Sequence, residues 1–553
     1  MILGLDIGGT HMDAVCIKEG EVVTTAKVST AHDLVGSIIG SISALDIDHE
    51  ALQRVVLSTT LSTNAIVEKK YARSGMIVSA GPGIEPRGYF LSDDFFQVQG
   101  AIDHRGREYI PIREDQIIAV TRELQSRGIK GVGVVSKFAV RNPAHELAVH
   151  AFIERSFTHI TIGHQMSGNL NFPRRIHTTY FNTAVMPIQE AFVRSVKQAL
   201  GELRIRARLL FLKADGGTFS TYAADRLPVE TILSGPAASM MGSVALSQDS
   251  DHTCTLVLDI GGTTTDMGIL VDGSPILEPS GISVGGLKTL VRGLKMFTVG
   301  AGGDSVVHID EGKLRVGPQR DGPPACMGGL QPTPMDALRV LDEFAIGDKR
   351  RAEEALTVVA RHLGKNSKEV ARLVIEALMH TIWEAYHAFI EEVNVHPLCI
   401  RSRMMLHPDI VKPQQVMVIG APADILKPYI ERVFQMQCIV PEHAGVANAL
   451  GAALARTTAQ ITVLADTQRR KFVCPELDID EIIPITFTLD DVRLRGMQAL
   501  WDNSIYLGLV DDVDVDVVEA QCFNMVSGFR TVGRNMRLKL QTRSGILKGR
   551  GAL

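Results

Sequence analysis

Two stretches of the chain place aspartates, paired glycines and threonines in the same order after a short apolar run. The residues of the first stretch are Asp6, Gly8, Gly9, Thr10 and Asp13, and those of the second are Asp259, Gly261, Gly262, Thr263, Thr264 and Asp266. Glycines lack a Cβ atom and tolerate positive φ angles, so the backbone N–H groups of such a turn can point at one anion. Threonine hydroxyls add further donors. The repeated pattern therefore predicts two phosphate-binding hairpins.

The first aspartate of each stretch carries a negative charge that repels a phosphate group. Carboxylate oxygens are, however, preferred ligands of Mg²⁺, and this ion accompanies phosphates in phosphoryl-transfer sites. We therefore expect Asp6 and Asp259 to hold Mg²⁺, directly or through water, or to orient an attacking oxygen.

A hydroxyl-rich segment follows another apolar run at residues 55–57. It contains Thr59, Thr60 and Asn64 among five hydroxyl groups and one amide within seven residues. Such residues cap the N-terminus of a helix, and a helix is expected here up to Tyr71. The polar groups exceed what one cap requires, so the segment equally predicts a surface that binds a substrate. The residues leave both interpretations open.

Two small-residue segments late in the chain predict a place for the adenosine half of a nucleotide. The buried strand 416–419 ends in a turn at Gly420, and a helix rich in Ala and Gly follows Pro441 and contains Asn448. Small side chains allow the backbone to approach a neighbouring helix or a ligand closely. His443 stands alone in this region and is expected to cap or pack rather than to bind a ligand.

The elements that position these residues alternate between strands and helices. Each glycine pair is expected to join two strands, the second of which covers 14–17 in one copy and 267–270 in the other. Helical periodicity at 114–128 is followed by an apolar strand at 131–135. This alternation predicts an α/β fold with a mainly parallel or mixed sheet and helices on its faces. The long pattern at 367–393 predicts a core helix.

Composition favours an enzyme of a reducing compartment. The formal net charge of −5 and the absence of a basic stripe argue against nucleic acid as a partner, which leaves small molecules and other proteins. The seven cysteines are an odd number, widely scattered and without a Cys-x-x-Cys pair, so no disulfide framework is expected. No basic leader and no apolar run of bilayer length is visible. We therefore expect a cytoplasmic enzyme without a membrane anchor.

The length of 553 residues predicts two to four domains. We expect an N-terminal domain at 1–185 with the first hairpin and a second domain at 186–460 with the second hairpin and the adenosine site. Residues 461–553 are expected to form a small β-containing appendage, because segments alternate there and an Asp-rich run covers 511–516. A Gly/Pro-rich stretch at 316–334 is long for a structureless loop, and such loops are usually functional or mobile.

These patterns together resemble the actin, sugar-kinase and chaperone-ATPase superfamily and, within it, the hydantoinase A/oxoprolinase family. The resemblance covers residues 1–460 in order. It implies duplicated ribonuclease-H-like domains around a nucleotide cleft. The segments that carry it are Asp6 to Asp13, Thr59-Thr60, Thr63-Asn64-Ala65, Asn142 to Glu146, Ser234 to Ala238, Asp259 to Asp266, the loop glycines Gly300, Gly302 and Gly303 with Ala301, Arg315 to Pro318, and Ala444 to Gly451.

The resemblance implies an ATP- and Mg²⁺-dependent hydrolase that opens a cyclic amide such as hydantoin or 5-oxoproline. Phosphorylation of the unreactive carbonyl oxygen makes a leaving group, after which water attacks carbon. Asp6 and Asp259 would place Mg²⁺ and the γ-phosphoryl group. Asp13 and Asp266 would either organise the turn or act on the attacking group. The family also implies a second, B-type subunit and an oligomer.

Three other activities stay open at this point. They are a small-molecule kinase that releases its phosphorylated product, a ketone carboxylase subunit, and a nucleotide-driven activator or binding protein.

The chain also departs from the family pattern in three places. Asp304 stands where the family usually has a fourth glycine, the adenosine turn is reduced to Gly420-Ala421-Pro422-Ala423, and the stretch 321–329 matches loosely.

Overall fold

The computed structural model describes nine stretches of the chain, which are residues 1–9, 11–30, 33–247, 254–278, 280–395, 398–400, 403–405, 411–509 and 514–547. The chain folds into two compact units. Unit 1 comprises Met1–Ala237, Ser280–Gly293 and Ala455–Leu553, and unit 2 comprises Ala238–Pro279 and Leu294–Leu454. The domain boundaries expected from the sequence, at 185 and 460, stay predictions.

The first sheet of unit 1 has six strands in the order β12-β11-β4-β1-β2-β3. β1, β4 and β11 are parallel, whereas β2 runs antiparallel to β1 and β3 antiparallel to β2. Helices α1 (Leu34–Ser43) and α5 (Phe172–Glu202) bury apolar side chains against it. The strands are β1 Ile2–Ile7, β2 His11–Lys18, β3 Glu21–Ser29, β4 Arg54–Thr59, β11 Arg208–Leu212 and β12 Thr218–Ser220.

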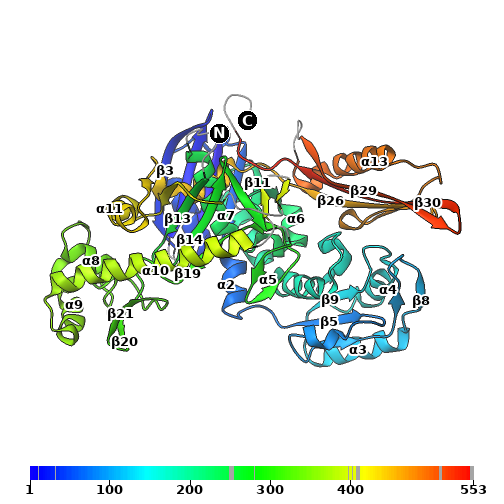
Figure 1. The fold of residues 1–553 in the computed structure, drawn as a ribbon, viewed down its shortest axis with the longest axis horizontal. Helices are drawn as coiled ribbons and strands as arrows, with labels where there is room; N and C mark the ends of the chain where they lie inside the picture. Colours follow the sequence, from blue (N-terminus) through cyan, green and yellow to red (C-terminus); the bar gives the residue numbers. More distant parts are fainter. Residues whose placement is uncertain are drawn as a thin grey trace. The chain divides into compact units, whose positions relative to one another are not determined.

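A second sheet of unit 1 contains four parallel strands in the order β10-β9-β5-β6. Helices α3 (Glu114–Ser126) and α4 (Ala144–Ile153) pack on it (Figure 1), so the helix predicted at 114–128 and the strand predicted at 131–135 are confirmed. The strands of this sheet are β5 Ser74–Ser79, β6 Phe95–Gln97, β9 Gly131–Ser136 and β10 His159–Ile162. Two further strands, β7 Ala101–Ile102 and β8 Glu108–Ile110, pair with each other.

The C-terminal segment of unit 1 forms an antiparallel sheet of five strands in the order β28-β27-β26-β30-β29. Its core is covered by α13 (Leu489–Asp502). The predicted β structure is thus present, although residues 511–513 of the Asp-rich run lie outside the described residues. The strands are β26 Gln460–Asp466, β27 Lys471–Cys474, β28 Ile479–Ile482, β29 Val515–Ser527 and β30 Arg530–Thr542.

Unit 2 is built on a sheet whose central order is β15-β14-β13-β24-β25. β13 and β14 are antiparallel, β14 and β15 are antiparallel, and β24 and β25 continue parallel to β13. This order repeats β3-β2-β1-β4-β11 of unit 1. The strands are β13 Cys254–Ile260, β14 Thr265–Val271, β15 Ser274–Glu278, β19 Phe297–Val299, β22 Leu398–Ile400, β23 Arg403–Met405, β24 Gln415–Ile419 and β25 Gln437–Ile439.

The longest helix of unit 2 is α10 (Ser367–Val395), and it confirms the core helix predicted at 367–393. Val370, Val374, Leu378 and Ile382 are fully buried, so a stripe at helical spacing faces the core. The other helices are α7 Ser234–Leu246, whose first turn belongs to unit 1, α8 Pro334–Val340, α9 Lys349–Leu363, α11 Ala423–Phe434 and α12 Ala447–Leu454.

One buried carboxylate organises the Gly/Pro-rich stretch that precedes α8. Asp336 accepts hydrogen bonds from the backbone N–H groups of Ala325, Cys326 and Thr333 at 3.0, 2.7 and 2.9 Å. The Thr333 hydroxyl in turn accepts from the Asp336 N–H and completes a capping box. The stretch is therefore fastened to the helix that follows it.

Among the described residues, no helix combines the length and the apolar character needed to cross a lipid bilayer.

Candidate functional site

The first predicted hairpin is present in unit 1 between β1 and β2. Asp6 and Asp13 are direct partners in the strand register, so their side chains share one face of the sheet. The Gly8 N–H donates to the His11 carbonyl at 3.1 Å and closes the turn. The position that a Cβ of Gly9 would take is open, with no atom within 4 Å. Thr10, predicted as a phosphate donor, lies outside the described residues.

A serine on the neighbouring strand holds the first aspartate. Ser58 on β4 is the register partner of Asp6, and its hydroxyl donates to Asp6 Oδ1 at 2.5 Å. Asp13 lies 2.9 Å from the Lys27 ammonium group. Burial raises the pKa of Asp13, and the nearby Lys27 charge offsets this only in part. The two carboxylates of this hairpin are therefore in different environments.

The second predicted hairpin, between β13 and β14 of unit 2, repeats this geometry. Asp259 and Asp266 are direct register partners, and the Gly261 N–H donates to the Thr264 carbonyl at 3.0 Å. A serine again holds the first aspartate, because the Ser239 hydroxyl on α7 lies 2.5 Å from Asp259 Oδ2. Both hairpins thus present a serine-held aspartate and a second carboxylate opposite it.

The carboxyl group of Asp266 has a strongly raised pKa. Burial, and secondarily the negative charge of Asp259, raise its pKa to about 7, although a hydrogen bond from the Thr298 hydroxyl at 2.5 Å opposes the shift. A carboxyl group with such a pKa can accept or release a proton near neutral pH. This group is a candidate acid–base residue.

The predicted glycine loop at Gly300, Gly302 and Gly303 lies against the tip of the second hairpin. The Gly303 N–H donates to the Gly261 carbonyl at 2.9 Å. A Cβ at Gly302 would lie 2.6 Å from the Gly261 carbonyl oxygen, and a Cβ at Gly300 would lie 2.7 Å from Pro318 Cβ. The contacts leave no room for side chains at Gly300 and Gly302, and the loop packs directly against the backbone of the hairpin tip.

Asp304, which departs from the family pattern, has its charge offset by an arginine. Its Oδ2 atom lies 3.1 Å from Nη2 of Arg320, and its N–H donates to the Gly262 carbonyl at 2.6 Å. The carboxylate lies so close to the hairpin that a Cβ at Gly262 would approach it to 2.5 Å. Asp304 and Arg320 therefore add a neutral pair to the tip.

Of the three threonines in the second hairpin, one packs inside the protein and two are partly exposed at the tip. Thr265 is buried and donates to the Ala301 carbonyl at 2.6 Å, which fixes the hairpin to the glycine loop. Thr263 and Thr264 are half-buried, and neither hydroxyl has a protein partner among the described residues. These two hydroxyls fit the predicted role of donors to a ligand.

The two segments predicted for adenosine also come close to Asp259. Gly420, at φ 99°, follows β24, and a Cβ there would lie 3.0 Å from Asp259 Oδ1 and 2.4 Å from the Ile260 carbonyl oxygen. Asn448 Oδ1 lies 3.0 Å from the Ser239 hydroxyl that holds Asp259. Asp259, Gly420 and Asn448 are therefore brought together in unit 2.

The close helix approach predicted for the small-residue segment is confirmed. A Cβ at Gly451 on α12 would lie 2.1 Å from the Ala238 carbonyl oxygen of α7, and a Cβ at Gly242 would lie 2.1 Å from the Ala447 carbonyl oxygen. The two helices pack backbone to backbone. This contact keeps Ser239 of α7 and Asn448 of α12 within hydrogen-bond distance.

The hydroxyl-rich segment fastens a neighbouring turn of unit 1. Thr63 accepts from the N–H of Leu233, a residue held at φ 59°, at 2.8 Å. Thr59 is buried, and its backbone exchanges hydrogen bonds with the Ser234 hydroxyl. Asn64 donates to the Thr60 hydroxyl at 3.3 Å on the exposed side of α2 (Leu61–Val67). Among the predicted substrate residues, Thr59 is thus structural, whereas Thr60 and Asn64 stay at the surface.

A related sequence, Asp-Gly-Gly-Thr at 215–218, lacks the residue between the aspartate and the glycines and forms a turn that is closed to a ligand. The position that a Cβ of Gly217 would take lies 1.9 Å from the Thr458 hydroxyl, so another part of the chain fills this turn. Asp215 accepts from Thr458 at 3.1 Å, and Lys213 donates to the Thr458 carbonyl at 2.9 Å. The turn anchors the strand connection that leads into the C-terminal sheet.

Two protein-family models match most of the chain up to residue 461. The hydantoinase/oxoprolinase model matches residues 175–461, and the model of the hydantoinase/oxoprolinase N-terminal region matches residues 2–157. The chain belongs to the hydantoinase/oxoprolinase family. The family expected from the sequence is thereby confirmed.

Named relatives of this hydantoinase/oxoprolinase family member are distant in sequence. The chain is 24% identical to the caprolactamase subunit alpha of Pseudomonas jessenii over 62% of its own length and 55% of the relative's length. The match therefore spans about half of that relative.

Two solved structures share the fold over nearly the whole chain. One is the nucleotide-free structure of acetone carboxylase, whose description names ATP-dependent acetone carboxylation. It has a TM-score of 0.73 at 18% sequence identity, and the match covers 99% of this chain and 88% of the acetone carboxylase chain. The other is the ATP-dependent caprolactamase from Pseudomonas jessenii, with a TM-score of 0.70 at 19% sequence identity. This match covers 98% of this chain and 87% of the caprolactamase chain. The mixed α/β class expected from the sequence is confirmed.

Proposed function

We propose that this chain is an ATP- and Mg²⁺-dependent hydrolase that opens a cyclic amide after phosphorylating its carbonyl oxygen. The observation that carries the proposal is the repeated hairpin with a serine-held aspartate and a second carboxylate directly opposite. The proposal includes two duplicated domains of the actin and sugar-kinase type around a nucleotide cleft. The same strand order in the sheets of the two units supports this duplication.

The donor set of the hairpins fits Mg²⁺. This ion usually takes one or two protein carboxylates and completes its shell with water and phosphate oxygens. Asp6 in unit 1 and Asp259 in unit 2 are each proposed as a ligand of this ion, and each already has its orientation fixed by a serine hydroxyl. No group of three or more His, Cys, Asp or Glu side chains with metal-site geometry occurs among the described residues. Bound Mg²⁺ would offset the negative charge of the triphosphate.

The remaining residues of the second hairpin would act on phosphate and on the proton balance. The Thr263 and Thr264 hydroxyls would donate hydrogen bonds to phosphate oxygens. Such donors stabilise the negative charge that develops on the transferred phosphoryl group. Asp266 would take a proton from the attacking group, because its pKa of about 7 leaves a substantial ionised fraction at neutral pH. Gly420 and Asn448 would border the adenosine.

Ring opening needs this activation because an unstrained amide carbonyl is a poor electrophile. Once the carbonyl oxygen carries a phosphoryl group, water attacks the carbon, and the ring C–N bond breaks as the nitrogen takes up a proton. A second water then attacks the carbon of the resulting acyl phosphate, which leaves a carboxylate and releases the original carbonyl oxygen as part of phosphate. The hydroxyl and amide groups of Thr60 and Asn64 lie on the surface of unit 1 and would contact the substrate. The relative named caprolactamase subunit alpha supports a cyclic amide as the substrate class.

A carboxylase is the second candidate function. The acetone carboxylase structure shares the fold across almost the whole chain, and its description names ATP-dependent acetone carboxylation. The same phosphoryl transfer would then activate an oxygen of the ketone or of bicarbonate. Stimulation of ATP turnover by a ketone with bicarbonate, and not by lactams, distinguishes this activity.

A partner subunit is part of the proposal, since a named relative is one subunit of its enzyme. Such a subunit would take part in the steps that follow phosphorylation of the carbonyl oxygen.

The test is ADP release by the purified chain with Mg·ATP in the presence of hydantoin, 5-oxoproline or caprolactam, or of acetone with bicarbonate. We expect one lactam to stimulate ADP release, and Asp259→Asn to reduce the stimulated rate at least 100-fold. Asp310→Asn, an exposed aspartate on β20 (Val307–Asp310), is the matched control and keeps the wild-type rate. A stimulated rate that Asp259→Asn leaves intact contradicts the proposed site.

A further inference from the structure

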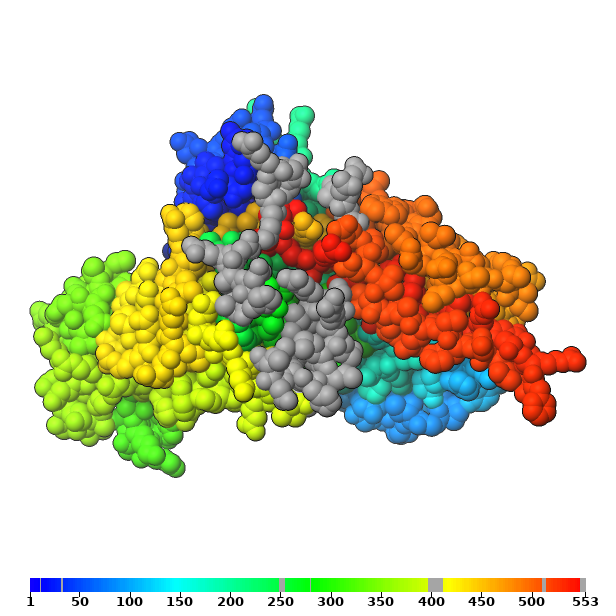
Figure 2. Space-filling view, turned by 45° about the horizontal axis from the view of Figure 1, so that its top comes forward, coloured from blue at the N-terminus to red at the C-terminus, as the bar shows by residue number. Residues whose placement is uncertain are grey.

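An arginine of unit 2 that the proposed function leaves without a role lies beside the tip of the second hairpin. Arg320 follows the pair of strands β20 and β21 (Lys313–Val316), and Figure 2 shows these strands, in green, projecting from the surface around them. The Val306 N–H donates to the Gln319 carbonyl at 2.8 Å, which brings the chain back to the glycine loop just before Arg320. The backbone therefore places Arg320 next to the loop that packs against the tip.

The guanidinium group of Arg320 reaches the tip through one carboxylate. Its Nη2 atom donates to Asp304 Oδ2 at 3.1 Å, and the same carboxylate oxygen would lie 2.5 Å from a Cβ at Gly262. The Asp304 N–H donates to the Gly262 carbonyl at 2.6 Å, so the backbone also fixes Asp304 to the tip. A negatively charged oxygen therefore lies against a glycine of the tip and accepts a hydrogen bond from an arginine.

Arg320 has donors left over for a ligand. A guanidinium group carries five N–H donors and no acceptor. The bond to Asp304 is the one hydrogen bond of the Arg320 side chain among the described residues, and its Nε atom is buried there without a partner. The side chain is 25% exposed, so a ligand at the tip can reach it. The planar fork of donors in arginine matches the paired oxygens of a phosphate group.

We propose that Arg320 binds a phosphate group of the nucleotide at the second hairpin, and that Asp304 holds Arg320 at the tip until phosphate oxygens replace its carboxylate. This inference rests on the proposed function, because it takes the second hairpin as the site of the triphosphate. The Asp304 carboxylate shows that an oxygen beside Gly262 can accept from Arg320. A phosphate oxygen is a charged acceptor of the same kind.

Asp304 then competes with phosphate for the same arginine. Its carboxylate keeps Arg320 within reach of the tip, but its negative charge repels the triphosphate. Loss of the Asp304 charge should therefore strengthen nucleotide binding, whereas loss of Arg320 should weaken it. A purely structural ion pair predicts shifts in one direction, because removal of either partner breaks the same contact.

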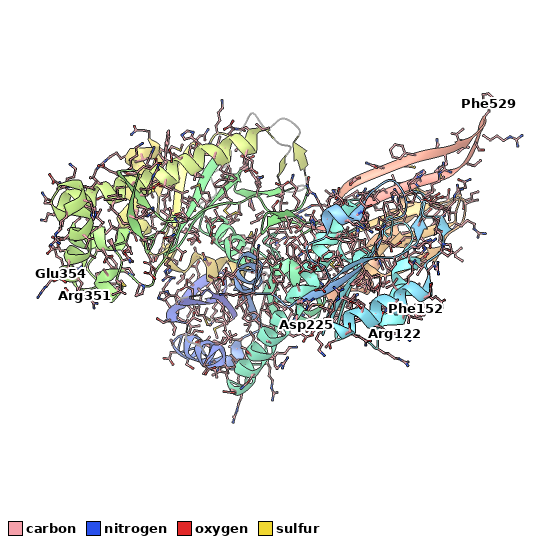
Figure 3. The ribbon with its side chains drawn as sticks, turned by 90° about the horizontal axis from the view of Figure 1, so that it is seen from below. Arg122, Phe152, Asp225, Arg351, Glu354 and Phe529 are labelled. Carbon is pink, nitrogen blue, oxygen red and sulfur yellow. The ribbon has the colours of Figure 1, made fainter. Side chains whose placement is uncertain are left out.

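The test is isothermal titration calorimetry of the full chain with Mg·ATP. Arg320→Gln should raise the dissociation constant about 10-fold or more, because a charge-assisted hydrogen bond to phosphate is lost. Asp304→Asn keeps an acceptor for Arg320 but removes the repelling charge, so it should lower the dissociation constant by roughly 3- to 10-fold. Arg351→Gln is the matched control, because Arg351 is exposed on α9, where Figure 3 labels it, and it should leave the dissociation constant unchanged.

The opposite directions of the two shifts distinguish a phosphate contact from a structural ion pair. A dissociation constant that rises in both variants, or that either variant leaves unchanged, would overturn the inference. Asp259→Asn separates this outcome from the proposed function. If Asp259→Asn weakens Mg·ATP binding and Arg320→Gln does not, the nucleotide site stands and the role of Arg320 is wrong. A wild-type chain that does not bind Mg·ATP would overturn both.

Discussion

At the scale of single residues, the two hairpins are related by what holds their aspartates. Ser58 holds Asp6 from a neighbouring strand, whereas Ser239 holds Asp259 from a helix, each at 2.5 Å. A hydrogen bond to a carboxylate fixes its orientation and favours its ionised form. The same constraint is thus supplied from two different kinds of element.

Ser239→Ala should lower the stimulated kcat/KM for ATP roughly 10- to 100-fold, which is the usual effect of removing a group that orients a metal-binding carboxylate. The physical reason is that Asp259 loses its hydroxyl donor while its charge remains. Steady-state ADP release measures the effect. Ser243→Ala, one turn further along α7, is the control because the Ser243 hydroxyl donates to the Ser239 carbonyl. Equal rates for both variants would contradict the assigned role of Ser239.

Asp266 makes stability depend on pH. Its folded pKa of about 7 is higher than the value near 3.9 expected for an unfolded chain, so the group favours the folded state at low pH. That contribution is lost as the pH rises from about 4 through 7. Asp266→Asn removes the dependence and should become more stable relative to wild type between pH 5 and pH 8, as measured by Tm. A difference in Tm that stays constant across this range would argue against the raised pKa.

At the scale of elements, the glycine loop and the second hairpin form one packed pair. Gly302 has no room for a side chain, because its Cβ position lies 2.6 Å from the Gly261 carbonyl oxygen and 2.8 Å from the Gly262 carbonyl oxygen. Both contacts are to backbone atoms, which cannot swing away as a side chain would. The shape of the hairpin tip therefore depends on the loop.

Gly302→Ala should destabilise the chain by about 1–3 kcal/mol, the usual cost of overpacking a closely packed site. It should also weaken Mg·ATP binding, because the hairpin tip is displaced. Urea unfolding and calorimetric titration measure the two effects. Gly40→Ala on α1 is the control, since no atom lies within 4 Å of that Cβ position. Unchanged stability and affinity in Gly302→Ala would show that the loop does not support the tip.

A buried histidine joins three elements of unit 1. His164 contacts Glu146 of α4 through Nδ1 at 2.7 Å and Asp478 through Nε2 at 2.9 Å. Burial alone would lower the pKa of His164, but the hydrogen bonds to Asp478 and Glu146 outweigh it and raise the pKa to about 9. The charged imidazole therefore fastens the C-terminal sheet to the four-stranded sheet.

This ion pair predicts a second dependence on pH with a different window. Because the folded pKa of His164 is raised above 6.5, its stabilisation is complete below pH 6.5 and is lost as the pH rises through 9. His164→Gln should lower Tm strongly at pH 6 and less at pH 9.5. His380→Gln, an exposed histidine of α10, should leave Tm unchanged at both values. An equal loss of Tm at pH 6 and pH 9.5 for His164→Gln would rule out the charged state.

At the scale of the whole molecule, the sequence predicted what depends on local pattern. Paired glycines after apolar runs predicted both hairpins, and periodicity predicted α10, because turn chemistry and amphipathic spacing are properties of neighbouring residues. The pattern missed Ser239, whose contact with Asp259 spans 20 residues. It also missed the role of the Asp-Gly-Gly-Thr turn at 215–218, because that turn is filled by Thr458, which lies far along the chain.

The central claim of this account is that the carbonyl oxygen of a cyclic amide is phosphorylated. The most direct measurement follows an ¹⁸O label placed in the carbonyl of the lactam that stimulates ADP release most. Phosphorylation of that oxygen predicts that one ¹⁸O atom appears in inorganic phosphate for each ring opened. If the released phosphate carries no label and all ¹⁸O stays in the carboxylate of the product, carbonyl phosphorylation is contradicted.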